Sequence, residues 1–361
     1  MKSRIPPHSA TPPDLLRKGR DYLFCYLLGG LGGGLFFWLH SPLPWLLGAL
    51  VFVATARLAG APVMASRPLR NGAMLLLGCA LGLFFTPHAS EHIARHGLLV
   101  LGAALVTLAI GIALAPLLAR LARLDRASAL FGSIPGGVAE MSLLGESYGA
   151  RPSAVAVVQL LRVVGVVVMV PTSFMLLGVQ GQFAGALAAV TQGFSPGGFV
   201  LLMGAGALAA LVLGRIGVRN FWLLGGLLVS AGLTMTGYNL SGVPMALTAA
   251  GQIALGAHLG VQFERATFLG GGRMLSGALV HVALLTGICA VLGVALGLGF
   301  GLDPATMVLA TAPGGVAEMS LTAKILLLEV PVVVAFHLVR IFMVAVLVQP
   351  VSIVLRRRGM L

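Results

Sequence analysis

Two acid–base pairs in apolar surroundings are the residues of this chain best placed to do chemistry. Glu140 is followed 22 residues later by Arg162, and Glu318 is followed at the same spacing by Arg340. Deep in a membrane an unpaired charge costs roughly 3 kcal/mol or more, so we expect each glutamate to pair with the arginine of its own copy. Two roles are open. The arginines bind an anionic substrate while the glutamates exchange protons, or the pairs only clamp neighbouring helices together.

Each glutamate lies within PGGVAEMSL, a sequence that occurs twice. The first copy covers Pro135 to Leu143, and the second begins at Pro313, 178 residues later. Proline removes a backbone donor and two glycines accept almost any backbone angle, so a helix must break here. The helix that restarts presents free N–H groups and a partial positive charge, which attract a small anion. The repeat therefore predicts a binding site at each break.

The candidate binding residues come from both copies. A hydroxyl lies two residues before each proline, and Gln159 and His337 lie three residues before the arginines, on the same helix face. The candidate substrate-binding residues are Ser133, Gly136, Gly137, Glu140, Gln159, Arg162, Thr311, Gly314, Gly315, Glu318, His337 and Arg340.

The composition is that of a polytopic membrane protein. The chain is 58% hydrophobic and only 9% charged, whereas soluble domains carry roughly 25% charged residues. Apolar runs of about 20 residues recur from end to end. The net charge of +13 comes mostly from basic residues at span ends, so we expect no nucleic-acid partner. The expected partners are the lipid bilayer and a small solute, and a homo-oligomer is compatible with the sequence.

The apolar runs predict spans whose order repeats. In the first half they cover residues 22–39, 43–59, 69–85 and 98–119, a broken segment at 127–149, and 152–177. In the second half they cover 199–213, 221–235, 244–262 and 274–300, a broken segment at 304–328, and 331–355. We expect a disordered cytoplasmic tail over residues 1–20, a membrane repeat over 21–178 and a second repeat over 197–355, all within one membrane domain.

The distribution of basic residues predicts the topology. If each broken segment dips into the membrane and returns, nearly all Lys and Arg residues lie on one side, as the positive-inside rule requires. Five full spans per half then make the two repeats inverted. The prediction is an all-α protein of the bacterial inner (plasma) membrane, with about ten full transmembrane helices, two re-entrant helices at Pro-Gly-Gly, and both termini in the cytoplasm. If the broken segments cross fully, twelve spans and parallel halves result.

Three weaker features accompany the motif. His88, His92 and His96 are spaced four residues apart, so two of them could share a metal on a helix, although an interfacial turn explains them as well. His258 and His281 fit as core histidines. The pairs Gly78/Gly82 and Gly256/Gly260 are expected to be close packing faces between helices.

These residues resemble a known family. A full-length duplication with P-G-G-x-x-E-M in each half, followed by a span with a central arginine, is similar to the AbrB-type membrane protein family. Its members carry two labels, ammonia monooxygenase and regulator of gene expression. A copper monooxygenase needs a histidine-rich ligand cluster, and a DNA-binding regulator needs a soluble basic module. The sequence argues against both as direct activities.

The leading prediction is a secondary transporter of a small solute that could be an anion, coupled to H⁺ or Na⁺ and without a cofactor. Its site would lie between the two breaks near the middle of the bilayer, as in other inverted-repeat transporters. One alternative is a membrane-bound, metal-dependent monooxygenase. Another is a membrane sensor that binds without transport and affects gene expression indirectly.

Overall fold

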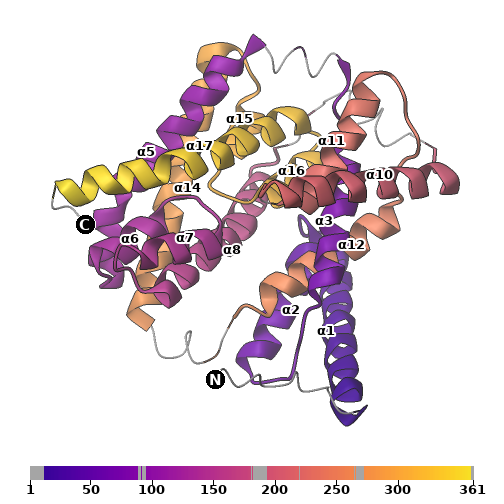
Figure 1. Ribbon diagram of the computed structural model, residues 1–361, viewed down its shortest axis with the longest axis horizontal. Coiled ribbons are helices and arrows are strands. Elements are labelled where there is room, and N and C mark those ends of the chain that lie inside the picture. Colours follow the sequence, from indigo (N-terminus) through magenta and orange to yellow (C-terminus); the bar gives the residue numbers. More distant parts are fainter. Residues whose placement is uncertain are drawn as a thin grey trace, which may run out of the picture.

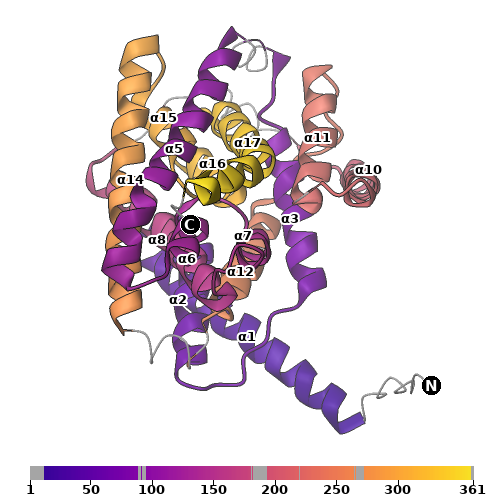
Figure 2. The ribbon, with the colours of Figure 1, turned by 60° about the vertical axis from the view of Figure 1, so that its left-hand side comes forward.

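The structure is a computed structural model that describes residues 12–87, 91, 95–179, 181, 193–218, 220–263, 265 and 272–358. Within these residues every regular element is a helix (Figures 1 and 2). The first half contains α1 (Pro12–Trp38), α2 (Pro44–Leu58), α3 (Arg67–Gly82), α5 (Gly97–Ala122), α6 (Arg126–Ser133), α7 (Val138–Glu146) and α8 (Pro152–Leu176). The second half contains α10 (Pro196–Arg215), α11 (Phe221–Met235), α12 (Met245–Gly260), α14 (Gly272–Phe300), α15 (Pro304–Thr311), α16 (Val316–Ile325) and α17 (Val330–Arg357).

Most helices begin and end within a few residues of the expected spans, but α1 is longer. It begins at Pro12 rather than at the expected Tyr22, so the prediction of a disordered tail is wrong for residues 12–20. Proline is tolerated in the first helical turn, and the Leu, Arg and Lys residues that follow are good helix formers. Residues 1–11 of the expected tail lie outside the described residues.

The outer helices carry the surface of a membrane protein. By length and composition, α5, α8, α10, α14 and α17 can each cross a membrane, and α2 and α11 are shorter apolar helices. Large apolar side chains point outward, among them Leu208 of α10 and Val291 of α14, which are 65% and 69% exposed. Large apolar side chains exposed on so many helices are unfavourable in water and favourable against lipid. The protein is therefore a polytopic helical membrane protein.

The helices form two bundles, each built from both halves of the chain. The first bundle contains α1, α2 and α3 together with α10, α11 and α12, and its helices run down the right-hand side of Figure 1. The second bundle contains α5 to α8 together with α14 to α17. Helices α3 and α16 form the most extensive helix contact between the bundles. Most packing therefore lies within a bundle.

Helices related by the 178-residue offset make equivalent contacts. Helix α3 packs on α11 as α12 packs on α2, and α5 packs on α17 as α14 packs on α8. The glycine pairs are the close faces expected of them. A Cβ atom at Gly78 would collide with the backbone of Leu223 in α11, and one at Gly256 would collide with the backbone of Leu46 in α2. Glycine therefore sets the distance between these helices.

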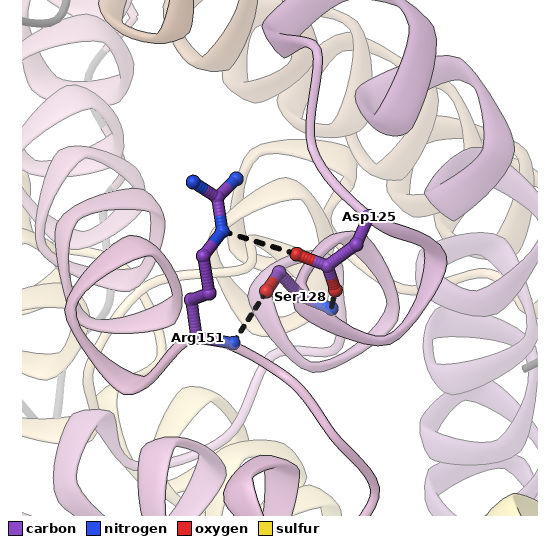
Figure 3. Close-up of polar contacts among 3 residues, drawn as sticks. All are labelled: Asp125, Ser128 and Arg151. Carbon is purple, nitrogen blue, oxygen red and sulfur yellow. Dashed lines mark hydrogen bonds and ion pairs between the residues drawn. The ribbon is translucent and has the colours of Figure 1, made fainter.

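Each broken segment is a hairpin of two short helices, α6–α7 and α15–α16. The two ends of the first hairpin meet, because the backbone N–H of Arg151 donates to Ser128 Oγ at 2.7 Å (Figure 3). In the second hairpin the backbone N–H of Glu329 donates to Thr306 Oγ1 at 3.3 Å. In each segment the chain therefore returns to the level at which it entered.

Candidate functional site

The helix breaks lie where Pro-Gly-Gly requires them. Helix α6 ends at Ser133 and α7 restarts at Val138, and the residues between include extended backbone at Ile134 and Gly137. In the second repeat α15 ends at Thr311 and α16 restarts after the extended Gly315. Each break therefore places a helix C-terminus, with its unpaired carbonyls, beside a helix N-terminus with its unpaired N–H groups.

The buried arginines bind the backbone of the breaks. Arg162 donates through Nη1 to the carbonyl of Ile134 and through Nη2 to that of Gly136, each at 3.0 Å. Arg340 likewise donates to the carbonyls of Ala312 and Gly314. The ion pairs among the described residues do not join either arginine to the glutamate of its own repeat, so the expected pairing is not found there. The negative end of the broken helix supplies free carbonyl acceptors, which a cation can satisfy.

The glutamates lie at the opposite helix ends. Glu140 and Glu318 are in the first turns of α7 and α16, where negative charge is favoured. Their carboxylates fold back over the preceding glycines. A Cβ atom at Gly137 would lie 3.0 Å from Glu140 Oε1, and one at Gly315 would collide with Glu318 Oε2. The glutamates thus lie at the positive helix N-termini, and the arginines lie at the negative helix C-termini.

Two further candidate residues brace the first break. Gln159 donates through Nε2 to the carbonyls of Phe131 at 2.6 Å and Ile134 at 2.8 Å. Ser133 donates through Oγ to the carbonyl of Gly111 at 2.5 Å, and the same Oγ lies 3.1 Å from His281 Nε2. Both residues hold α6 against its neighbours.

Their counterparts in the second repeat are also buried. Thr311 donates to the carbonyl of Cys289 in α14 at 2.8 Å. His337 is completely buried in α17. Like Ser133 and Gln159, these two residues lie behind the cavity wall described next.

One cavity is shared by both breaks. It has a volume of about 370 Å³. Of the twelve candidate residues, eight line it: Gly136, Gly137, Glu140, Arg162, Gly314, Gly315, Glu318 and Arg340. Further wall residues come from α8 and α17 of the second bundle and from α3, α11 and α12 of the first, so the cavity lies at the junction of the two bundles. The breaks, 178 residues apart in sequence, thus face a common space.

Four polar residues of the cavity were missed by sequence reasoning. They are Arg70 in the first turn of α3, Asn220 just before α11, His258 in the last turn of α12, and Gln262 just after it. Each lies near a helix end, where polar residues normally mark the membrane boundary. His258 is therefore a wall residue of the cavity rather than only a core histidine.

The base of the first hairpin is closed by Asp125, shown in Figure 3. One of its oxygens accepts from the backbone N–H of Ser128 at 2.7 Å, and the other accepts from Arg151 Nε at 3.2 Å. Partial burial works against ionisation here, but the hydrogen bonds from Ser128 and Arg151 outweigh it and lower the pKa of Asp125. This carboxylate both caps α6 and ties the hairpin ends together.

The histidine run is only partly within the described residues. His88 and His92 lie outside them, and His96 precedes α5. In the part of the chain that the structure describes, no group of three or more His, Cys, Asp or Glu residues is placed to hold a metal ion.

Fold and cavity together define a polytopic helical membrane protein with two broken helices around a shared polar space. The chain belongs to the AbrB family, because the sequence profile described as "Transition state regulatory protein AbrB" matches residues 45–356. It is 30% identical over 312 residues to "Putative regulator AbrB" of Escherichia coli (strain K12), covering 84% of this chain and 87% of the relative. It is also 27% identical over 245 residues to "Uncharacterized protein YhjN" of Bacillus subtilis (strain 168), covering 64% of each chain.

Proposed function

We propose that this protein is an ion-coupled transporter of a small anionic solute in the bacterial inner membrane. The observation that carries this proposal is the cavity shared by both Pro-Gly-Gly breaks. Irregular backbone at membrane depth is tolerated only where protein surrounds it or where it lines a water-filled cavity. Paired helix breaks around one cavity are typical of secondary transporters.

The repeats are proposed to be inverted, over residues 21–178 and 197–355 of one membrane domain. The equivalent helix contacts, such as α3 with α11 and α12 with α2, support an approximate two-fold relationship. The hairpins with closed ends support re-entry rather than crossing. Basic residues such as Arg123, Arg126 and Arg151 at the first hairpin then lie in the cytoplasm, together with both termini. The second hairpin enters from the outside.

The two-bundle arrangement supplies a route to alternating access. The cavity lies between the bundles, and α3 and α16 make the main contact across that junction. A small rotation of one bundle against the other would open the cavity to one side and close it to the other, while packing within each bundle is kept.

The charge of the cavity favours an anion. Three arginines (Arg70, Arg162 and Arg340) and two glutamates (Glu140 and Glu318) line it. The positive ends of α7 and α16 add to the positive potential. The net positive potential of the cavity therefore favours a small anion, and H⁺ or Na⁺ is the proposed coupling ion. Movement of a metabolite that another protein senses would also account for a regulatory effect of the kind named in the relative from Escherichia coli.

The proposal is tested by reconstitution in liposomes. Uptake of radiolabelled acetate, lactate and inorganic phosphate is measured with an inward proton gradient, an inward sodium gradient, or neither. We expect saturable uptake of at least one anion, above that of protein-free liposomes, under one of the gradients. The variant Val138→Phe, which fills the cavity wall, should abolish this uptake. The matched variant Val200→Phe, on a 68% exposed position of α10, should leave it unchanged.

The alternatives predict different results. A rise in melting temperature with one of these anions, without uptake of any of them, would support a sensor. Copper or iron bound to the purified protein, and lost on His92→Ala, would support a monooxygenase.

A further inference from the structure

The two halves of the cavity differ in one cation. Arg70 lines the cavity from the first turn of α3, and the equivalent position of the second repeat, 178 residues later, is Thr248. Arg70 and Glu318 line the same cavity, yet the ion pairs of the described residues do not include these two groups. Arg70 is half-buried and makes one long hydrogen bond, at 3.3 Å, to Asn71. It is therefore a cation with donors still available at the cavity wall.

Glu318 occupies the place that a bound anion would take. Its carboxylate folds over Gly315 at the N-terminus of α16, in a helix of 10 residues. The residue is only 7% exposed. Among the described residues, no hydrogen bond runs to its carboxylate from any other residue. Its charge is stabilised mainly by the helix end and by the field of Arg70. Loss of that charge would leave the positive helix end and Arg70 without a counter-ion.

We propose that the transported solute is a small monovalent anion that competes with the Glu318 carboxylate for the N-terminus of α16 and is held there by Arg70. This proposal rests on the proposed transport function and names its coupling ion. One proton from the cavity water binds the carboxylate of Glu318, and one anion enters. On the other side both leave, so the cavity returns to its starting charge and the cycle is an electroneutral proton–anion symport.

The remaining charged groups are consistent with this exchange. The charged groups that line the same cavity are Glu140 from α7, Arg162 from α8 and Arg340 from α17, and the titratable His258 of α12 lines it as well. Arg162 and Arg340 already bind backbone carbonyls through both terminal nitrogens. Helix α15 carries no charged residue, and Lys324, on α16 itself, lies over the ring of Phe84 at 5.6 Å. Arg70 is thus the arginine best able to accept the solute.

An anion in this position would also bridge the two bundles. Arg70 belongs to α3 of the first bundle and Glu318 to α16 of the second, and these helices make the main contact between bundles. Binding therefore changes the contact across which the bundles would move. If the bundles moved with neither a bound anion nor an ionised Glu318, the charge of Arg70 would be left without a counter-ion. Such a movement is unfavourable, so uncoupled transport is disfavoured.

The test uses uptake of labelled acetate and lactate into proteoliposomes. For wild-type protein above the titration range of Glu318, uptake should fall about tenfold for each unit rise in external pH, since the protonated fraction falls by that factor. Glu318→Gln should remove this pH dependence and abolish accumulation against a gradient, while downhill exchange remains. The matched control is Glu146→Gln, at an exposed position at the end of α7, which should behave as wild type.

A second pair of variants tests the anion site itself. Arg70→Gln should raise the KM for acetate and lactate about tenfold or more, whereas Arg67→Gln, on the exposed first residue of the same helix, should not. Melting temperatures in detergent establish that each variant is folded. Proton-driven accumulation that persists in Glu318→Gln, or an unchanged KM in Arg70→Gln, would overturn this inference and leave transport standing. No uptake of any tested anion by wild-type protein would overturn both proposals.

Discussion

The Nη2 atom of Arg162 lies 3.0 Å from the carbonyl oxygen of Gly136, 26 residues earlier in the chain. Arg340 makes the equivalent contact with Gly314. In both repeats a buried cation thus fixes the shape of the unwound backbone rather than neutralising a nearby carboxylate. This arrangement leaves the glutamates at the helix N-termini, facing the cavity.

The first prediction concerns this backbone contact. Arg162→Lys should lower the stability of the protein by about 2 kcal/mol, because one ammonium group cannot reproduce a fork that donates to two carbonyls. The melting temperature of the detergent-solubilised protein measures the effect. Arg120→Lys, at an exposed position near the end of α5, is the matched control and should change little. Equal melting temperatures for the two variants would contradict the assigned role of Arg162.

The second prediction concerns helix spacing in the first bundle. Gly78→Ala should destabilise the protein by about 1–3 kcal/mol, because its methyl group would collide with the backbone of Leu223. Gly287→Ala in α14 is the control, since nothing lies within 4 Å of a Cβ atom there. The control should be neutral or slightly stabilising, because alanine is the better helix former. Thermal unfolding of the two variants measures these effects. If Gly78→Ala did not change the stability, α3 and α11 would have to lie further apart than in the structure.

The third prediction is a pH dependence at the base of the first hairpin. The pKa of Asp125 is lowered in the folded protein, since its hydrogen bonds with Ser128 and Arg151 outweigh partial burial. Its contribution to stability is therefore present above the pKa of the unfolded chain and is lost as the pH falls through the folded pKa. Asn can still cap α6 but carries no charge.

Accordingly, wild-type protein should exceed Asp125→Asn in stability at neutral pH by under about 1 kcal/mol, as expected for a partly exposed pair. The difference should vanish in acid. Melting curves of both proteins across this pH range test the prediction, and a difference that grows toward acidic pH would refute it.

Sequence reasoning located the helices and both breaks because their signals are local. Apolar runs between helix-breaking residues define the spans, and Pro-Gly-Gly cannot continue a helix. The 178-residue duplication also indicated that the two breaks belong together, and they share one cavity. The start of α1 was misplaced because a polar sequence can be helical without being buried.

The partners of the charged residues were not predictable by the same means. Pairing Glu140 with Arg162 assumed that a buried charge requires an opposite charge, whereas the broken helix supplies carbonyl acceptors. A count of the unpaired carbonyls at the end of α6 would have pointed to Arg162 and Gln159. Arg70 was missed because it enters the cavity only through the packing of α3 against α16.

The central claim is that two oppositely oriented repeats bring their breaks to one cavity. Its most direct test is labelling of Asp125→Cys and Asp303→Cys, two exposed and equivalent helix caps, by a membrane-impermeant maleimide. The three native cysteines, Cys25, Cys79 and Cys289, are buried and are replaced by alanine as background. The account predicts labelling from the cytoplasm at position 125 and from the outside at position 303. Labelling of both positions from the same side would contradict it.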